Sequence, residues 1–101
     1  MHLNLNHTLK NFKGEDLKIG DKPQFMFVVV AQSLFAGEFI EKTGNPDKDC
    51  GKKLIAYDLC SRLMKNNGEM DVTAEEAVMI KESIANLTAG CYSQIVKFID
   101  G

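Results

Sequence analysis

The first residues of the chain alternate between apolar and polar positions, which is typical of a half-buried β-strand. In HLNLNHTL one face of the extended chain consists of Leu3, Leu5, His7 and Leu9. The following KGED, residues 13–16, reads as a turn, and Leu17 with Ile19 as a short returning strand. A lone hairpin is marginally stable in water, so we expect residues 1–20 to form a β-hairpin packed on the rest of the chain.

The least polar segment, PQFMFVVVAQSLF at residues 23–35, could be a membrane anchor, a buried strand, a core helix or a partner surface. Its uninterrupted apolar run covers seven residues, 25–31. A bilayer span needs about 20, so the membrane interpretation fails. Pro23 suits the first turn of a helix, and no turn signal follows before Gly44. We predict a helix over 24–41. Its β-branched residues are poor helix formers, so burial in the core must outweigh their low helix propensity.

A break follows, in which Gly44 ends one helix, Asn45 can cap the next, and Pro46 fits its first position. The next predicted helix covers 47–66 and ends at the strong stop signal NNG, residues 66–68. One apolar stripe of this helix contains Leu54, Tyr57, Cys60 or Ser61, and Met64. Beside that stripe lie Ala56, Leu59 and Leu63.

The clearest local signal is a capping box, because Thr73 stands three residues before Glu76. It predicts a helix over 73–87 that buries Ala77, Ile80, Ile84 and Leu87. A last predicted helix covers 90–99, and one of its faces carries Tyr92, Ile95, Val96 and Ile99. Residues 70–72 are expected to add an extended piece to the hairpin. The sequence therefore predicts one α+β domain over residues 1–101, an N-terminal β-hairpin packed against three to four helices.

Composition fits an ordinary globular domain, with 101 residues, 45% of them hydrophobic, and a formal net charge of −2. Eleven of the twelve basic residues are lysines, and Arg62 is the only arginine. This balance argues against nucleic acid as the main partner, since phosphate binding relies on clustered basic side chains. The alternating N-terminus does not resemble a signal peptide, and three scattered cysteines suit a reducing compartment. We expect a cytoplasmic location.

The segment GNPDKDCGKK, residues 44–53, has features of two ligand-binding loops. A Walker A loop needs glycine where Pro46 stands, and serine or threonine where Lys53 stands. An EF-hand needs glycine where Cys50 stands and glutamate where Ala56 stands. The segment therefore reads as a capped polar turn, and we predict no bound phosphate or calcium.

The residue types that carry most catalysis and metal binding occur in no recognisable arrangement. His2 and His7 point to opposite faces of an extended strand. The spacings of Cys50, Cys60 and Cys91 match no zinc motif, and buried cysteine usually behaves as a small hydrophobic residue. We therefore predict no catalytic, cofactor-binding or metal-binding residues, and no enzymatic activity.

The segment KKLIAYDLCSRLMKNNGEMDVTAEEAVMIKESI, together with CYSQIVKFIDG and the N-terminal LN pair, resembles small proteins encoded in phage and prophage gene clusters. The shared features are an LN hairpin, a basic helix, a capped third helix and a C-terminal helix that opens near a tyrosine. The resemblance implies a phage-associated setting and assigns no functional residues.

Two hypotheses about function remain. In the first, the chain is a non-enzymatic interaction or assembly module that self-associates or binds another protein, because apolar residues exceed what a small core needs. The candidate interface residues are Phe35, Phe39 and Phe98. In the second, the chain is a regulatory binder of nucleic acid or an anionic ligand. Its basic helix face would be Lys48, Lys52, Lys53, Arg62 and Lys65.

Overall fold

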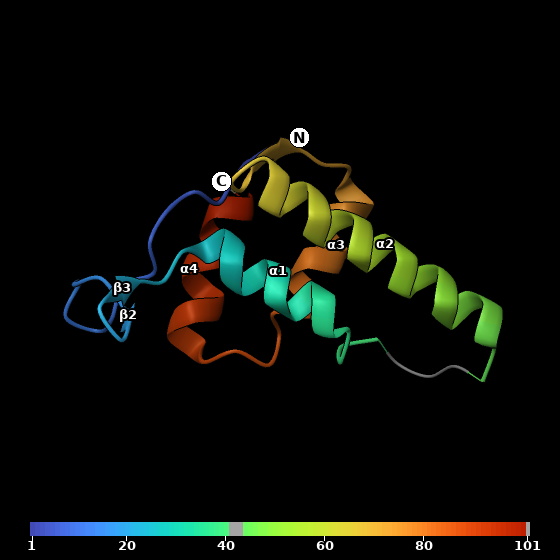
Figure 1. The fold of residues 1–101 in the computed structure, drawn as a ribbon, viewed down its shortest axis with the longest axis horizontal. Helices are drawn as coiled ribbons and strands as arrows, with labels where there is room; N and C mark the ends of the chain where they lie inside the picture. The colour runs from blue at the N-terminus through green and yellow to red at the C-terminus, as the bar shows by residue number, and fades with distance from the viewer. Residues whose placement is uncertain (41–43, 101) are drawn as a thin grey trace.

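A computed structural model of the chain describes residues 1–40 and 44–100. It contains four helices, α1 (Met26–Ala36), α2 (Pro46–Lys65), α3 (Ala74–Ser83) and α4 (Ala89–Asp100). The strands are β1 (His2–Asn4), β2 (Lys18–Ile19), β3 (Lys22–Pro23) and β4 (Glu69–Asp71). Figure 1 shows the helices packed together, with β2 and β3 at one end of the molecule. The predicted α+β class, with N-terminal antiparallel strands and four helices, is confirmed.

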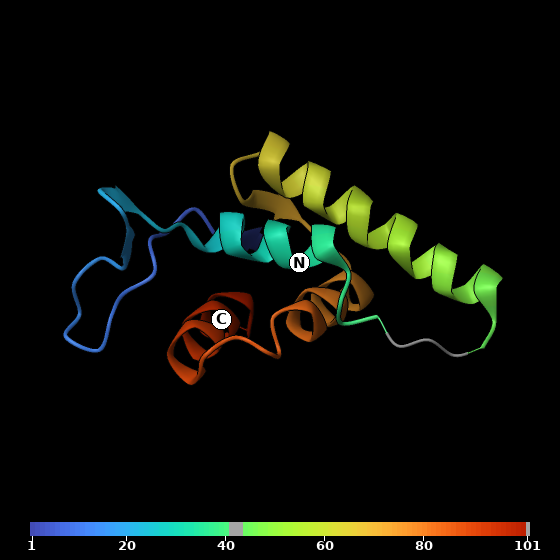
Figure 2. The same ribbon diagram turned by 60° about the horizontal axis from the view of Figure 1, so that its bottom comes forward.

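The segment that is least polar in the sequence forms the central helix of the bundle. α1 lies between α2 on one side and α3 with α4 on the other (Figure 2). Five of its residues are buried: Met26, Phe27, Val30, Ala31 and Leu34. Neighbours on several sides also shield Val28 and Val29 partly, which explains how β-branched residues are accommodated in a helix. No helix within the described ranges has both the length and the apolar character that crossing a bilayer requires.

The predicted end of this helix was wrong. We expected the helix to reach residue 41, but α1 stops at Ala36, because Gly37 adopts a left-handed conformation with φ of 67°. The Gly37 N–H still donates to the Ser33 carbonyl at 3.2 Å, which closes the last turn. Residues 41–43 lie outside the described part of the chain.

The first strand pairs with a different partner from the one predicted. β1 pairs antiparallel with β4, with Leu3 opposite Met70, and both side chains are buried. The expectation that residues 70–72 would join the N-terminal strand is thus met for Met70 and Asp71. The N-terminal hairpin itself is the two-residue pair β2 and β3, while the turn at 11–15 is closed by a single bridge between Lys10 and Asp16.

Alternation along residues 3–9 nevertheless predicted the buried leucines correctly. Leu3, Leu5 and Leu9 are almost wholly buried in the core. His7, which was assigned to the same face, is exposed, and its ring stacks on that of Phe98 with centroids 4.4 Å apart. The chain beyond β1 is irregular, so the strict period of two does not hold at His7.

Local capping explains where α2 and α3 begin. The Asn45 side chain accepts a hydrogen bond from the Lys48 N–H at 3.4 Å, and Pro46 occupies the first turn of α2. Thr73 Oγ1 accepts from the Glu76 N–H at 3.1 Å, and Glu76 Oε1 accepts from the Thr73 N–H at 2.9 Å. This is the predicted capping box. α3 ends at Ser83, earlier than the predicted residue 87, and Leu87 is only partly buried.

Candidate functional site

The apolar stripe that the sequence assigns to the helix at 47–66 lies largely in solvent. Leu54 is 72% exposed, Tyr57 59% and Met64 48%. The residues of α2 that enter the core are the three that we placed beside that stripe, Ala56, Leu59 and Leu63. Cys60, one of the two alternatives on the stripe itself, is also buried. Choosing Leu54, Tyr57 and Met64 as the principal stripe was therefore wrong as a description of the core.

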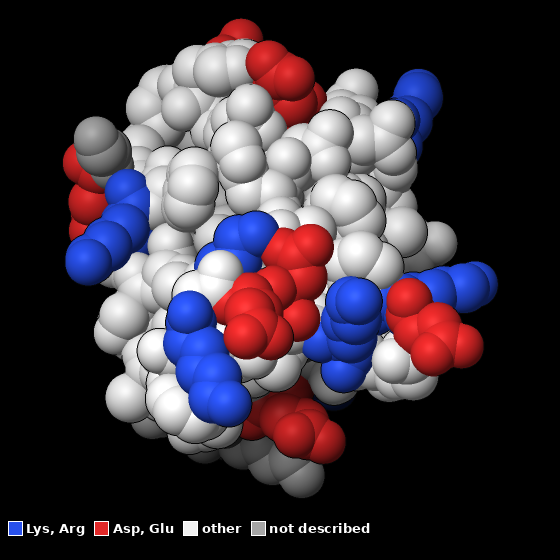
Figure 3. Space-filling view, turned by 90° about the vertical axis from the view of Figure 1, so that its left-hand side faces the viewer, with Lys and Arg blue, Asp and Glu red and all other residues white. Residues whose placement is uncertain are grey.

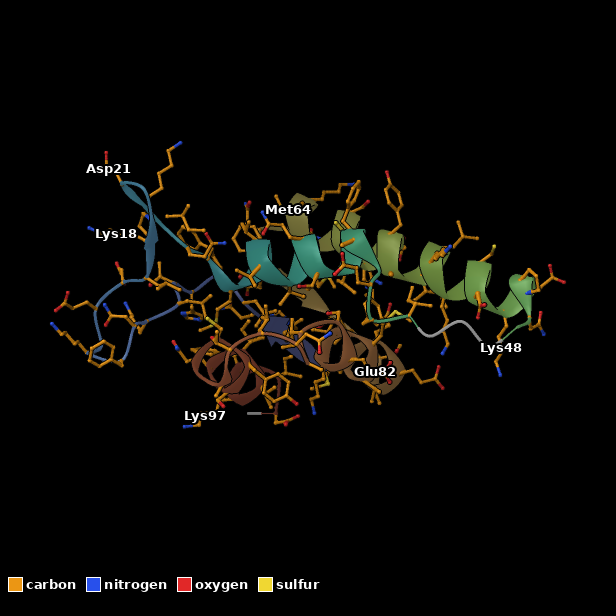
Figure 4. The ribbon with its side chains drawn as sticks, turned by 90° about the horizontal axis from the view of Figure 1, so that it is seen from below. Lys18, Asp21, Lys48, Met64, Glu82 and Lys97 are labelled. Atoms are coloured by element: carbon orange, nitrogen blue, oxygen red, sulfur yellow. The ribbon has the colours of Figure 1, made fainter. Side chains whose placement is uncertain are left out.

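Helix geometry explains how one helix can carry two such stripes. Successive residues are about 100° apart round an α-helix, so Tyr57 lies a quarter turn from Ala56, and Met64 likewise from Leu63. Figure 4 labels Lys48 and Met64 near the two ends of α2, and Met64 is the last residue of the exposed stripe. Because α1 covers the Ala56 and Leu59 side, most of the neighbouring stripe remains exposed.

α1 extends this apolar surface across the helix boundary. Phe35 is 70% exposed, and its ring centroid lies 6.3 Å from that of Tyr57, with an interplanar angle of 46°. A hollow at this point is lined by side chains of both helices, including Leu34 and Lys53, and by Ile40, which follows the end of α1. We call Phe35, Leu54, Tyr57 and Met64 the α1/α2 apolar face.

The three phenylalanines proposed as interface residues do not share one surface. Phe35 belongs to the α1/α2 apolar face. Phe39 is partly buried against the core and lines hollows on the side of α3, with Asn86. Phe98 is 43% exposed on α4, beside His7 and the hollow lined by His2 and Asn4. Only Phe35 lies beside other strongly exposed apolar side chains.

The five basic residues of the alternative hypothesis are also dispersed. Lys52 lines a hollow with Met79 and Glu82 toward α3, whereas Lys53 lines one with Phe35 toward α1. Arg62 is engaged by acidic side chains, with Nη1 2.6 Å from Glu76 Oε2 and 3.5 Å from Asp58 Oδ2. Lys48 and Lys65 are exposed near the two ends of α2. These positions do not form a single basic face.

Charges on the end of the molecule that carries β2 and β3 are mixed in sign. Figure 3 shows lysines and acidic residues interspersed there, with uncharged surface between them. One ion pair on this surface joins Lys10 to Asp16. The side-chain bonds from Lys10 and Thr8 hold the pKa of Asp16 below its usual value. This face offers both signs to a partner, with no continuous region of one sign.

Residues with catalytic or metal-binding potential are dispersed or already paired. His2 lies between two carboxylates, with Nδ1 3.1 Å from Asp71 Oδ1 and Nε2 3.1 Å from Glu69 Oε1. Over residues 1–40 and 44–100, no three His, Cys, Asp or Glu side chains are arranged to hold a metal ion. Burial raises the pKa of the Cys60 thiol, which lowers its reactivity. Cys50 is exposed, on the first third of α2.

Sequence reasoning missed Leu54, Tyr57 and Met64 as surface residues, although a signal was present. α2 carries two adjoining apolar stripes, and a helix on the surface of a small bundle normally buries only one. The excess on α2 therefore indicated that one stripe would remain exposed. Comparison of the chain with protein-family models, curated proteins and solved structures found no match.

Proposed function

We propose that this protein is a non-enzymatic interaction module that binds another protein surface through its α1/α2 apolar face. The observation that supports this proposal is the contiguous exposure of Phe35, Leu54, Tyr57 and Met64 on two packed helices. The phage-associated setting that the resemblance implies remains part of the proposal. An assembly or adaptor protein in such a setting would act through a surface of this kind.

The size of the face supports a binding role. Aromatic side chains each offer about 150–250 Å² for burial. At the exposures observed, the four side chains present on the order of 500 Å² of accessible surface. The largest apolar patch on a typical monomer is about 300–600 Å² and is often functional. At about 25 cal/mol per Å², removing this surface from water would contribute about 12 kcal/mol before the costs of association and ordering, which offset most of it.

The chemistry of the face specifies the kind of partner. Leucine, methionine and two aromatic rings present little hydrogen-bonding capacity apart from the Tyr57 hydroxyl group, while Lys53 and Asp58 lie on α2 at its flanks. Apolar centres with polar rims are typical of protein interfaces. A helix or an apolar groove with compatible rim charges would match this surface.

Site-specific photocrosslinking in producing cells tests the proposal. A photoreactive phenylalanine analogue replaces Leu54 in one variant and Val78 in the control, because Val78 is 52% exposed on α3 and outside the face. We expect discrete covalent protein adducts from position 54 and not from position 78. Adding Tyr57→Ser should reduce the adducts at position 54. Equal adduct patterns at both positions, or none at position 54, would contradict the proposed function.

A further inference from the structure

The exposed stripe of α2 has the spacing of a helix-pairing seam. Its positions are Cys50, Leu54, Tyr57, Ser61 and Met64, which follow one another at steps of four, three, four and three residues. Each of these residues is exposed. Alternating steps of three and four keep side chains on one line of a slightly supercoiled helix, and this line packs against a second helix.

Charged residues border this seam on α2. In heptad terms Leu54 and Ser61 take the first core position, and Tyr57 and Met64 take the second. Lys53 then occupies the flank on the side of α1, and Asp58 the opposite flank. Asp58 is 65% exposed despite its 3.5 Å contact with Arg62, so its carboxylate is accessible to another chain.

Charge complementarity favours one occupant and one orientation. When two identical helices pair in parallel and in register, a residue on the first flank faces the opposite flank of the other helix five residues later. Lys53 would thus face the partner's Asp58, and the two-fold axis would create that pair twice. In an antiparallel pair centred on this seam, Asp58 would instead lie close to the partner's Asp58, which is unfavourable.

The area agrees with a pairing of this kind. Two copies of the α1/α2 apolar face together offer on the order of 1,000 Å², which is near the lower limit for a specific interface. Phe35 lies against Tyr57 beside the Lys53 flank, so it would enlarge the contact beyond α2 itself. A dimer of this size would be stable at high protein concentration and would dissociate on dilution.

We infer that the α1/α2 apolar face binds a second copy of this chain, with the two α2 helices parallel and in register across a two-fold axis. This inference rests on the proposed function, and it identifies the partner of the same surface. It also places Cys50 of one copy next to the partner's Cys50, because residues of equal number meet in such a pair. In an antiparallel pair each Cys50 would face the Met64 end, roughly 20 Å from the partner's Cys50.

Sedimentation equilibrium of the reduced protein tests the electrostatic part of the inference. Lys53→Glu or Asp58→Lys alone should raise the dimer dissociation constant about tenfold, because each change opposes like charges twice. The double variant Lys53→Glu/Asp58→Lys should return to within about threefold of the unchanged protein. Lys97→Glu, on α4, is the control and should have no effect. Failure of the double variant to recover would overturn the parallel arrangement.

A short bismaleimide crosslinker tests the register. We expect it to join two copies through Cys50, to give no dimer with Cys50→Ser, and to give little with Leu54→Glu. A dimer that resists crosslinking at Cys50 would overturn the parallel register. A protein that remains monomeric at every concentration would overturn self-pairing altogether. Photocrosslinks from position 54 to a different protein would then still support the proposed function, so the two failures are distinguishable.

Discussion

The rings of Phe35 and Tyr57 contact each other across the boundary between α1 and α2, yet well over half of each residue remains exposed. The contact fixes two large apolar side chains at the surface and not in the core. Ordering side chains on binding costs about 0.5–1.5 kcal/mol each, so rings that are already held by each other reduce this cost. The pair therefore gives the α1/α2 apolar face a preorganised centre.

The two stripes of α2 should respond very differently to truncation. Leu59→Ala removes a side chain with no exposure and should lower the free energy of unfolding by about 2–5 kcal/mol. Leu54→Ala, on the same helix and with the same chemical change, should lower it by less than about 0.5 kcal/mol. Urea denaturation at a concentration where the protein is monomeric measures both. Similar losses for the two variants would place Leu54 in the core.

Gly68 should tolerate no side chain, because two effects coincide there. Its φ is 84°, and an added Cβ would lie 2.6 Å from Phe27 Cβ and 3.0 Å from the Leu5 carbonyl carbon. Gly14 has the same φ but open space around it, so Gly14→Ala isolates the backbone cost, about 1–2 kcal/mol. Gly68→Ala should cost about 1–3 kcal/mol more than that. Thermal unfolding of the two variants gives the comparison, and equal losses would mean that the Phe27 contact relaxes freely.

The capping box at the start of α3 should make a measurable contribution to the free energy of unfolding. Thr73→Ala removes the acceptor of the Glu76 N–H and should cost about 1 kcal/mol. Thr73→Ser keeps a hydroxyl group in the same place and is the control. Chemical denaturation at neutral pH measures both variants. A loss with Thr73→Ser as large as that with Thr73→Ala would show that the methyl group, and not the cap, is responsible.

Glu76 makes the stability that the capping box contributes depend on pH. The Thr73 N–H, and then the Arg62 guanidinium group, hold the pKa of Glu76 below its ordinary value of 4.5. A carboxyl group with a lowered pKa in the folded state adds stability above the unfolded pKa, and this stability is lost as the pH falls through the folded pKa. Glu76→Gln keeps the capping geometry without the charge. The stability advantage of the unchanged protein over Glu76→Gln should therefore be fully present above pH 4.5 and disappear as the pH falls through the lowered pKa of the folded state. An advantage independent of pH would contradict this.

His2 should make the stability of the protein depend on pH in the opposite direction. Hydrogen bonds to Asp71 and Glu69 raise the pKa of His2 above its ordinary value of 6.5. Its contribution to stability is therefore fully present below 6.5 and is lost as the pH rises through the folded-state pKa. Titration by NMR should show that Asp71→Asn lowers the pKa of His2. His2→Gln should abolish the part of the pH dependence that begins near pH 6.5 and extends through the raised pKa of the folded state.

Features that depend on neighbouring residues were predictable from the sequence. Thr73 with Glu76, Asn45 with Pro46, and the NNG at 66–68 each act within a few residues, so the starts of α2 and α3 and the end of α2 followed directly. The ends of α1 and α3 were exceptions. At Gly37, a single glycine inside an apolar run does not reveal whether its φ is positive. The end of α1 was therefore missed.

The sequence by itself determined the α+β class, the order of the four helices and the burial of the alternating leucines at residues 3–9. Only the tertiary structure decided that β1 pairs with β4 and which stripe of α2 is buried. Both stripes have helical spacing and similar apolar content, so the choice depends on where α1 docks. Whether a residue is buried depends on its contacts with elements that are distant in sequence. For that reason the same residues, Leu54, Tyr57 and Met64, read as core in the sequence and form the candidate interface in the fold.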